Sequence, residues 1–187
     1  MRKMKELQLY SLNQIRDKYG DKKLREIIDN FGLESVKRKI DCVNAETVKK
    51  IEYFVKSELE TSNDITNDRR VASHFVLDQN DKFLGFFSHY IKKLRLPNET
   101  NICNSKEVFY ITCLARDDGV TKDELDMKDI LDFAFGIFYS IKELTGGIDT
   151  VIVETDSEKL RNSYIKYGFS DIYNHDNDLF LLQMELS

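Results

Sequence analysis

The sequence has few of the residues that interrupt regular structure. Its 187 residues include 8 glycines and a single proline, Pro97, where average usage predicts roughly 13 glycines and 9 prolines. This scarcity predicts long helices and strands joined by polar loops rich in Asn and Asp. It also makes the position of each glycine informative.

Cysteines and long apolar runs are scarce as well. Cys42, Cys103 and Cys113 are an odd number, lie far apart and form no CxxC pair, which excludes a disulfide framework and a structural zinc site. No run approaches the roughly 18 apolar residues of a membrane span, and the basic N-terminus lacks the apolar segment of a signal peptide. We therefore expect a reduced, cytoplasmic protein with no membrane partner and, because its 3 histidines are isolated, no metal.

The chain does contain charge and aromatic side chains. Charged residues make up 33% and hydrophobic residues 41%, with a net charge of −5 and an isoelectric point near 5.3. The 12 Phe and 9 Tyr side chains supply the apolar area of a sizeable core, which argues against a disordered chain. At about 150 residues per domain, the length predicts a single domain over residues 1–187.

The first third of the chain has the spacing of amphipathic helices. Residues 1–34 predict a helical hairpin, whose first helix carries Leu7 and Tyr10 and ends at Gly20 and whose second helix ends near Phe31. Alternating apolar and charged residues in 35–43 predict a half-buried strand. A third helix is expected to begin after the N-cap Asn44, with one apolar face made of Val48, Ile51, Val55 and Leu59.

Residues 71–114 change to a period of two. Strands 71–77 and 82–91 are expected on either side of a hairpin loop, Asp78–Asp81. Gly85, inside the second strand, indicates a bulge or the close approach of another backbone. After a polar loop around Pro97, the apolar run 108–114 predicts a central strand.

The remainder alternates helices and strands. Asp126 is the expected N-cap of a long helix that ends at Gly146, and Gly136 inside it is interpreted as a close-packing position. A buried strand (150–154), a short helix that ends at Gly168 and strands 169–173 and 179–186 follow. Together these elements predict an α/β protein with a mixed, mostly antiparallel sheet flanked by helices.

The segment Asn162-Ser-Tyr164-Ile-Lys-Tyr-Gly168-Phe169, with the strand before it, carries a family resemblance. It resembles the Phe-Tyr-x-x-x-Gly-Phe ending of the last helix in the GNAT N-acetyltransferase superfamily. The N-terminal half is similar to a bacterial subgroup with a helical extension. The resemblance implies a GNAT-like sheet, with 1–34 as the helical hairpin and 35–187 as the acetyltransferase-like core.

The resemblance also implies acetyl-CoA as co-substrate. In the superfamily, acetyl-CoA lies between the strands that correspond to 108–114 and 150–154, and backbone N–H groups of the loop after the first strand hold the pyrophosphate. The residues implied here are Leu114 and Arg116, through their backbone, and Gly119, Val120, Thr121 and Lys122.

The loop departs from the family's pattern. Thr121 replaces a small residue, and four carboxylates lie in the loop: Asp117, Asp118, Asp123 and Glu124. Their charge repels a pyrophosphate unless the side chains point away, and Lys122 offsets part of it. Two alternatives therefore stay open: a degenerate loop that still binds acetyl-CoA, and a non-catalytic GNAT-like scaffold for binding or interaction.

By the same resemblance, Tyr164 protonates the departing CoA thiolate. A thiol of pKa about 8.5 leaves poorly as an anion, and a phenol of pKa about 10 supplies a proton without being ionised at neutral pH. The implied reaction is direct transfer of the acetyl group to a primary amine. The residue that takes the amine's proton stays open among His74, His89, Glu107, Glu154 and His175.

The acceptor and the partners stay open too. A small-molecule or protein amine is the expected acceptor, and the hairpin 1–34 is interpreted as a lid or as the contact of a homodimer. Some bacterial members of the GNAT superfamily are toxins that acetylate aminoacyl-tRNA. A protein that binds tRNA is expected to have a strongly basic surface. The net charge of −5 argues against nucleic acid, although basic clusters at 37–39, 69–70 and 92–95 keep tRNA as an alternative.

Overall fold

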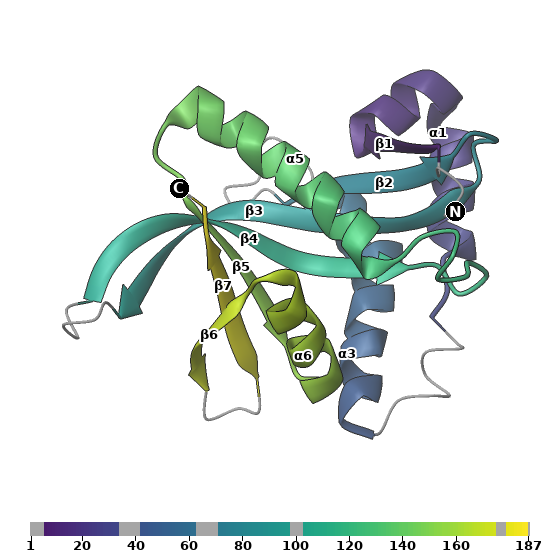
Figure 1. Ribbon diagram of the computed structural model, residues 1–187. Coiled ribbons are helices and arrows are strands. Elements are labelled where there is room, and N and C mark those ends of the chain that lie inside the picture. Colours follow the sequence, from purple (N-terminus) through teal and green to yellow (C-terminus); the bar gives the residue numbers. More distant parts are fainter. Residues whose placement is uncertain (1–5, 34–41, 63–70, 98–102, 175–178, 187) are drawn as a thin grey trace. The chain divides into compact units, whose positions relative to one another are not determined.

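A computed structural model describes residues 6–33, 42–62, 71–97, 103–174 and 179–186 (Figure 1). The chain divides into two compact units, the first made of Met1–Ser88 and Cys113–Phe133 and the second of His89–Thr112 and Ala134–Ser187. The single domain with a boundary after residue 34 stays a prediction. Within the described ranges, none of the helices is long and apolar enough to cross a membrane.

The strands form one seven-stranded sheet in the order β1-β2-β3-β4-β5-β7-β6. Among the described pairs, β4 and β5 are parallel, and β1–β2, β5–β7 and β6–β7 are antiparallel. The strands are β1 (Leu7–Ser11), β2 (Ala72–Asp78), β3 (Phe83–Pro97), β4 (Cys103–Arg116), β5 (Thr150–Thr155), β6 (Ser170–Asn174) and β7 (Phe180–Glu185). The helices are α1 (Leu12–Asn30), α3 (Cys42–Tyr53), the π-helical η1 (Phe54–Glu58), α4 (Leu59–Ser62), α5 (Met127–Thr145) and α6 (Glu158–Tyr167). The predicted mixed, mostly antiparallel α/β fold is confirmed.

The N-terminal segment differs from the predicted hairpin. Residues Leu7–Ser11 form a strand that pairs with β2, from Leu7↔Asp78 to Ser11↔His74. The Ser11 hydroxyl then caps α1 by accepting a hydrogen bond from the Gln14 amide (3.2 Å), while the Gln14 side chain accepts one from the Ser11 amide (2.7 Å). The prediction of a helix through Leu7 is therefore wrong, because pairing with β2 satisfies the backbone of this segment instead.

The later parts of the first unit follow the predictions more closely. Gly20, with a φ of 80°, separates two helical parts within α1, as predicted. The predicted strand 35–43 lies mostly outside the described residues, and it is wrong at Cys42 and Val43, where α3 has already begun before its expected N-cap Asn44. The strands on either side of Asp78–Asp81 are confirmed, and β3 continues to Pro97, beyond its expected end.

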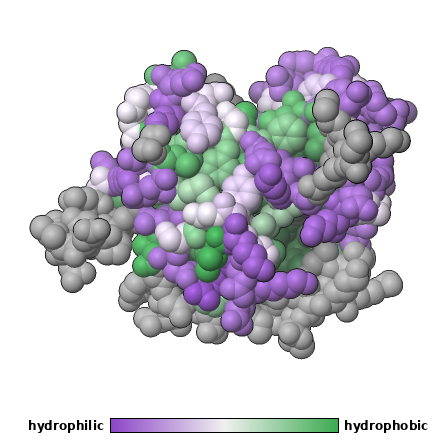
Figure 2. Space-filling view, in the orientation of Figure 1, coloured by the Kyte–Doolittle hydropathy of each residue, from purple (hydrophilic) through white to green (hydrophobic). Residues whose placement is uncertain are grey.

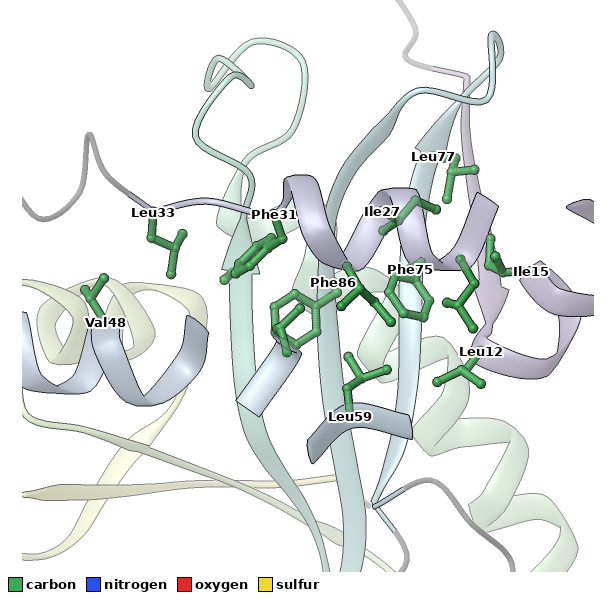
Figure 3. Packing of buried hydrophobic residues seen from close by; sticks show 14 residues of the cluster. Leu12, Ile15, Ile27, Phe31, Leu33, Val48, Leu59, Phe75, Leu77 and Phe86 are labelled. Carbon is green, nitrogen blue, oxygen red and sulfur yellow. The ribbon is translucent and has the colours of Figure 1, made fainter. Parts of the chain in front are cut away.

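The core of the first unit is built around three phenylalanines. Phe31 lies edge-on to Phe86, with ring centroids 5.4 Å apart, and Phe75 packs beside them (Figure 3). The helical segments surround the rings with buried aliphatic side chains, among them Leu12, Ile15, Ile27 and Leu59. Ala115, near the end of β4, belongs to the same cluster. This core therefore also holds the end of β4, from which the loop 116–126 begins.

The face of the molecule drawn in Figure 2 is mostly polar. Hydrophilic side chains cover most of the coloured atoms in Figure 2, with apolar side chains visible between them. Gly136 was predicted to be a close-packing position inside the long helix. In the structure it is exposed on α5, and a Cβ added there would meet nothing within 4 Å. The interpretation of Gly136 as a close-packing position is therefore wrong, because the apolar face of α5 does not include it.

The predicted cap of α5 is confirmed, and α6 also begins at a capping side chain. Asp126 and Asp129 cap α5 reciprocally, since the amide of each donates to the carboxylate of the other at 2.9 Å. The Ser157 hydroxyl caps α6 through the Leu160 amide, at 3.3 Å. α6 packs against β5, β6 and β7 in the second unit (Figure 1). These contacts fix the orientation of the helix that carries Tyr164.

Candidate functional site

The loop after β4 starts where two backbones meet closely. A Cβ on Gly85 of β3 would lie 2.6 Å from the Ala115 carbonyl oxygen and 2.8 Å from Leu125 Cδ2. The Asp117 amide donates to the Leu84 carbonyl at 2.9 Å. Gly85 was predicted to mark either a bulge or the close approach of another backbone, and the geometry shows the close approach. This contact fixes the position at which the loop leaves the sheet.

The loop 116–126 closes on itself. The Arg116 guanidinium donates from Nη1 to the Leu125 carbonyl at 3.1 Å, so its side chain holds the two ends of the loop together. The Val120 amide donates to the Asp117 carbonyl at 3.1 Å, and the Val120 side chain is buried. Arg116 and Leu114 are half-buried, and Gly119, Thr121 and Lys122 are exposed. The predicted cofactor-binding residues of the loop thus form a compact turn.

Two of the four loop carboxylates accept hydrogen bonds from backbone amides of the chain. Asp117 accepts hydrogen bonds from the Gly119 amide (3.1 Å, Oδ1) and from the Gly32 amide (3.2 Å, Oδ2). Glu124 Oε2 accepts from the Thr121 amide at 2.7 Å and from the Thr121 hydroxyl at 2.8 Å. The amides expected to bind pyrophosphate at Gly119 and Thr121 are therefore bonded to anionic oxygens of the chain itself.

The other carboxylate oxygen of Glu124 forms an ion pair. Lys82 Nζ, from the hairpin between β2 and β3, lies 2.8 Å from Glu124 Oε1. The hydrogen bond from Lys82, followed by those from Thr121, lowers the pKa of Glu124 to about 2. Glu124 is thus a carboxylate at all physiological pH values, and its charge occupies the Thr121 end of the loop.

Tyr164 in the second unit shows why its motif has the spacing Tyr-x-x-x-Gly-Phe. At the end of α6, the amides of Gly168 and Phe169 donate to the Tyr164 carbonyl at 3.1 and 3.0 Å, and Gly168 adopts a φ of 123° that turns the chain back. Phe169 then packs edge-on against the Tyr164 ring, with centroids 5.6 Å apart. The Tyr164 side chain is 5% exposed, and burial raises the pKa of Tyr164 to about 12.

The candidates for the proton acceptor have different environments. His74 stacks on Phe87, and burial lowers the pKa of His74 to about 4. His89 is buried and stacks on Phe109, with centroids 4.3 Å apart. Glu107 and Glu154 are exposed, and His175 lies outside the described residues.

The sequence reasoning missed Tyr110, the partner of Glu154. Burial, and after it the nearby Glu154 carboxylate, raises the pKa of Tyr110. The parallel pairs Phe109↔Val151, Tyr110↔Ile152 and Ile111↔Val153 set the register of the two strands. Alternation along two adjacent strands was the available signal, but it becomes informative only once β4 and β5 are known to pair.

Solved structures are similar to this chain over nearly its whole length, although no protein-family model and no curated protein matches the sequence. AtaT complexed with acetyl-methionyl-tRNAfMet matches at 15% identity, covering 94% of this chain and 93% of that one, with a TM-score of 0.62. A bacterial toxin matches at 12% identity over 98% and 92%, with a TM-score of 0.66. A mutant of KacT matches at 14% identity over 95% and 94%, with a TM-score of 0.64.

AtaT and KacT have the GNAT fold. This chain has the GNAT fold. At identities of 11–15%, the likeness extends to the fold alone. Along the chain, β4, the loop 116–126 and α5 follow one another in the predicted order, and α6 carries Tyr164. The cofactor-binding role of the loop and the catalytic role of Tyr164 stay predictions.

Proposed function

We propose that this GNAT-fold chain transfers an acetyl group from acetyl-CoA to a primary amine. The observation that carries the proposal is that the amides of Gly119 and Thr121 are already bonded to anionic oxygens, those of Asp117 and Glu124. Pyrophosphate oxygens accept the same bonds, so in the complex they would replace the carboxylates at these amides. A solved structure of this fold, AtaTR bound with acetyl-CoA, supports the same co-substrate.

The other loop residues have simple roles in this proposal. The backbone of Leu114 and Arg116, at the end of β4, would contact the pantetheine arm through hydrogen bonds. Val120 anchors the turn through its buried side chain, and Lys122 is exposed, so that its ammonium can approach the phosphates. The cation offsets part of the negative charge that the loop carboxylates add.

The reaction forms one bond and breaks another. The lone pair of the neutral amine attacks the thioester carbonyl carbon, the C–N bond forms, and the C–S bond breaks with its electron pair on sulfur. Tyr164 donates the phenolic proton to this thiolate and regains one from solvent, which receives the proton of the amine. Because burial raises the pKa of Tyr164 to about 12, the phenol is protonated at neutral pH. A thiolate in an equally dry environment also becomes more basic, which favours the transfer.

A thermal-shift experiment tests the proposal. A ligand that binds only the native state adds about 2.7 kcal/mol to the free energy of unfolding at a hundred times its Kd. For a chain of this size, that raises the Tm by roughly 5–11 °C. We expect this shift with acetyl-CoA and a much smaller one with S-acetylpantetheine, which lacks the pyrophosphate. No shift with millimolar acetyl-CoA would establish the non-catalytic scaffold instead.

The acceptor has a second candidate class, the amine of an aminoacyl-tRNA. Its support is the likeness to AtaT, which is seen with acetyl-methionyl-tRNAfMet. The net charge of −5 opposes it, because nucleic-acid binding depends on positive charge near the phosphates. Acetylation of methionyl-tRNA that is much faster than acetylation of methionine methyl ester, and that weakens steeply with added salt, would establish this class.

A further inference from the structure

Two tyrosines and a glutamate form a cluster in the second unit, outside the roles proposed above. Tyr110 on β4 is 6% exposed, and its ring centroid lies 5.4 Å from that of Tyr90 on β3. The rings are set in an apolar cluster that includes Val108, Ile152, Leu181 and, at its edge, Leu94 and Ile172. The neighbouring strands therefore hold two aromatic rings in a fixed arrangement.

Glu154 places a negative charge beside these rings. Tyr110 pairs with Ile152 in register, and Glu154, two residues further along β5, lies on the same face of the sheet as Ile152. The Glu154 carboxylate raises the pKa of the Tyr110 hydroxyl, which places the two groups close to each other. Glu154 is otherwise exposed, and a carboxylate has about four acceptor sites on its two oxygens. The carboxylate can therefore accept further hydrogen bonds from a ligand that arrives from solvent.

Lys92 shows what kind of group the Tyr110 ring accepts. Its Nζ lies 4.7 Å from the ring centroid, within the range of a cation–π contact. Lys92 is half-buried, whereas the next residue, Lys93, is exposed. A primary alkylammonium group, supplied by the chain itself, thus lies against the face of a tyrosine that has a carboxylate nearby.

We propose that Tyr90, Tyr110 and Glu154 form a binding site for a primary alkylammonium group, the charged form of the acceptor amine, and that Lys92 competes for this site. The aromatic faces and the carboxylate attract the cation, and the apolar edge at Leu94 and Ile172 accommodates an alkyl chain. The identity of the ligand as acceptor rests on the proposed function. The binding itself does not require acetyl-CoA.

The test measures binding of n-butylammonium chloride to the full chain, at constant ionic strength and without acetyl-CoA, by chemical-shift changes of the tyrosine ring protons. We expect saturable binding, and none with n-butanol, which has the same alkyl chain without the charge. Glu154→Gln removes the charge and keeps the shape, and we expect the Kd to rise about tenfold or more. The matched control is Glu143→Gln, which changes an exposed glutamate of α5 and leaves the Kd unchanged.

Lys92 supplies a second, opposite test. Lys92→Met removes the internal competitor, and we expect the Kd for n-butylammonium to fall about two- to fivefold, the equivalent of one exposed cation–π contact. Lys93→Met removes the same charge one residue further on, and it should have no such effect. Equal effects of the two lysine variants, or unchanged binding in Glu154→Gln, would overturn the site.

The outcomes separate this inference from the proposed function. Binding of n-butylammonium that depends on Glu154, in a protein that shows no thermal shift with acetyl-CoA, retains the ammonium site and overturns the acetyltransferase. If acetyl-CoA binds and amines are acetylated, Glu154→Gln should raise KM for the amine much more than it lowers kcat. Acetylation with an unchanged KM in Glu154→Gln retains the acetyltransferase and overturns the ammonium site.

Discussion

Replacing Glu124 by alanine should make the protein bind CoA more tightly and unfold more easily. In the structure, the Glu124 carboxylate accepts from the Thr121 amide and hydroxyl, at 2.7 and 2.8 Å, and pairs with Lys82 Nζ at 2.8 Å. If pyrophosphate binds the Thr121 amide, it first has to displace this carboxylate. The free energy that holds Glu124 in place is therefore subtracted from the free energy of CoA binding.

The magnitude follows from the contacts. A carboxylate bonded to a backbone amide at a cap contributes about 1 kcal/mol, with a range of about 0.5–2. The Glu124 and Lys82 side chains are 39% and 47% exposed, so solvent screens their ion pair and limits it to about 0.2–1 kcal/mol. Together they hold the carboxylate by about 1–2 kcal/mol, which corresponds to a gain in CoA affinity of about 5- to 30-fold in Glu124→Ala. The unliganded variant should melt roughly 2–8 °C lower.

Isothermal titration with CoA measures the affinity, and a melting curve without ligand measures the stability. Asp123→Ala is the matched control, because it removes an exposed carboxylate from the neighbouring position of the same loop. An affinity gain of the same size in both variants would show that Glu124 acts only through long-range charge. Weaker CoA binding in Glu124→Ala would show that Glu124 supports the loop in its binding conformation, and it would refute displacement.

Three further outcomes are expected. Tyr164→Phe should retain the thermal shift with acetyl-CoA and lower kcat by about 10²–10⁴, the usual contribution of a general acid; an unchanged kcat in steady-state assays would exclude Tyr164 as the acid. Gly85→Ala should lower the free energy of unfolding by about 1–3 kcal/mol in denaturant titrations, because its Cβ would lie 2.6 Å from the Ala115 carbonyl oxygen. Gly136→Ala, which meets nothing within 4 Å, should instead stabilise the protein by up to about 1 kcal/mol, and equal effects of the two variants would contradict the close approach. Burial lowers the pKa of His74 to about 4, so as the pH is lowered the unfolded state takes up the proton first, near pH 6.5. The free energy of unfolding should therefore decrease as the pH is lowered from about 6.5 to about 4, by up to about 3 kcal/mol. His74→Gln should flatten that part of the stability–pH profile, and an unchanged profile would contradict the burial effect.

In the proposed function, the acidic loop 116–126 has to accept an anionic co-substrate. Two of its carboxylates satisfy the loop's own amides, and one of these, Glu124, is further neutralised by Lys82. In the proposal, these carboxylates occupy the amides until the pyrophosphate binds there. Acetyl-CoA would then exchange one set of charge-assisted hydrogen bonds for another, at the cost of moving two acidic side chains into solvent.

Local signals in the sequence determined most elements of the fold. The reciprocal cap of Asp126 and Asp129 and the turn at Gly168 involve residues within five positions of one another, so spacing alone predicts them. The same holds for Tyr164, since its carbonyl accepts the hydrogen bonds that end α6. By contrast, the spacing of Leu7 and Tyr10 favours a helix, and only pairing with β2 makes this segment a strand.

Tertiary structure alone decided the chemistry around the candidate site. The resemblance implies Gly119 as the glycine of the phosphate loop, yet the hydrogen bonds and the ion pair of that loop involve Lys82 and Gly32, which lie far away in the sequence. In the same way, Tyr110, Glu154 and Lys92 come together only because β3, β4 and β5 lie next to one another in the sheet. The lid or homodimer contact at residues 1–34 stays a prediction. The physical reason is common to these cases: caps and turns are bonds between near neighbours in the chain, whereas partners of charges and rings are set by strand order and register.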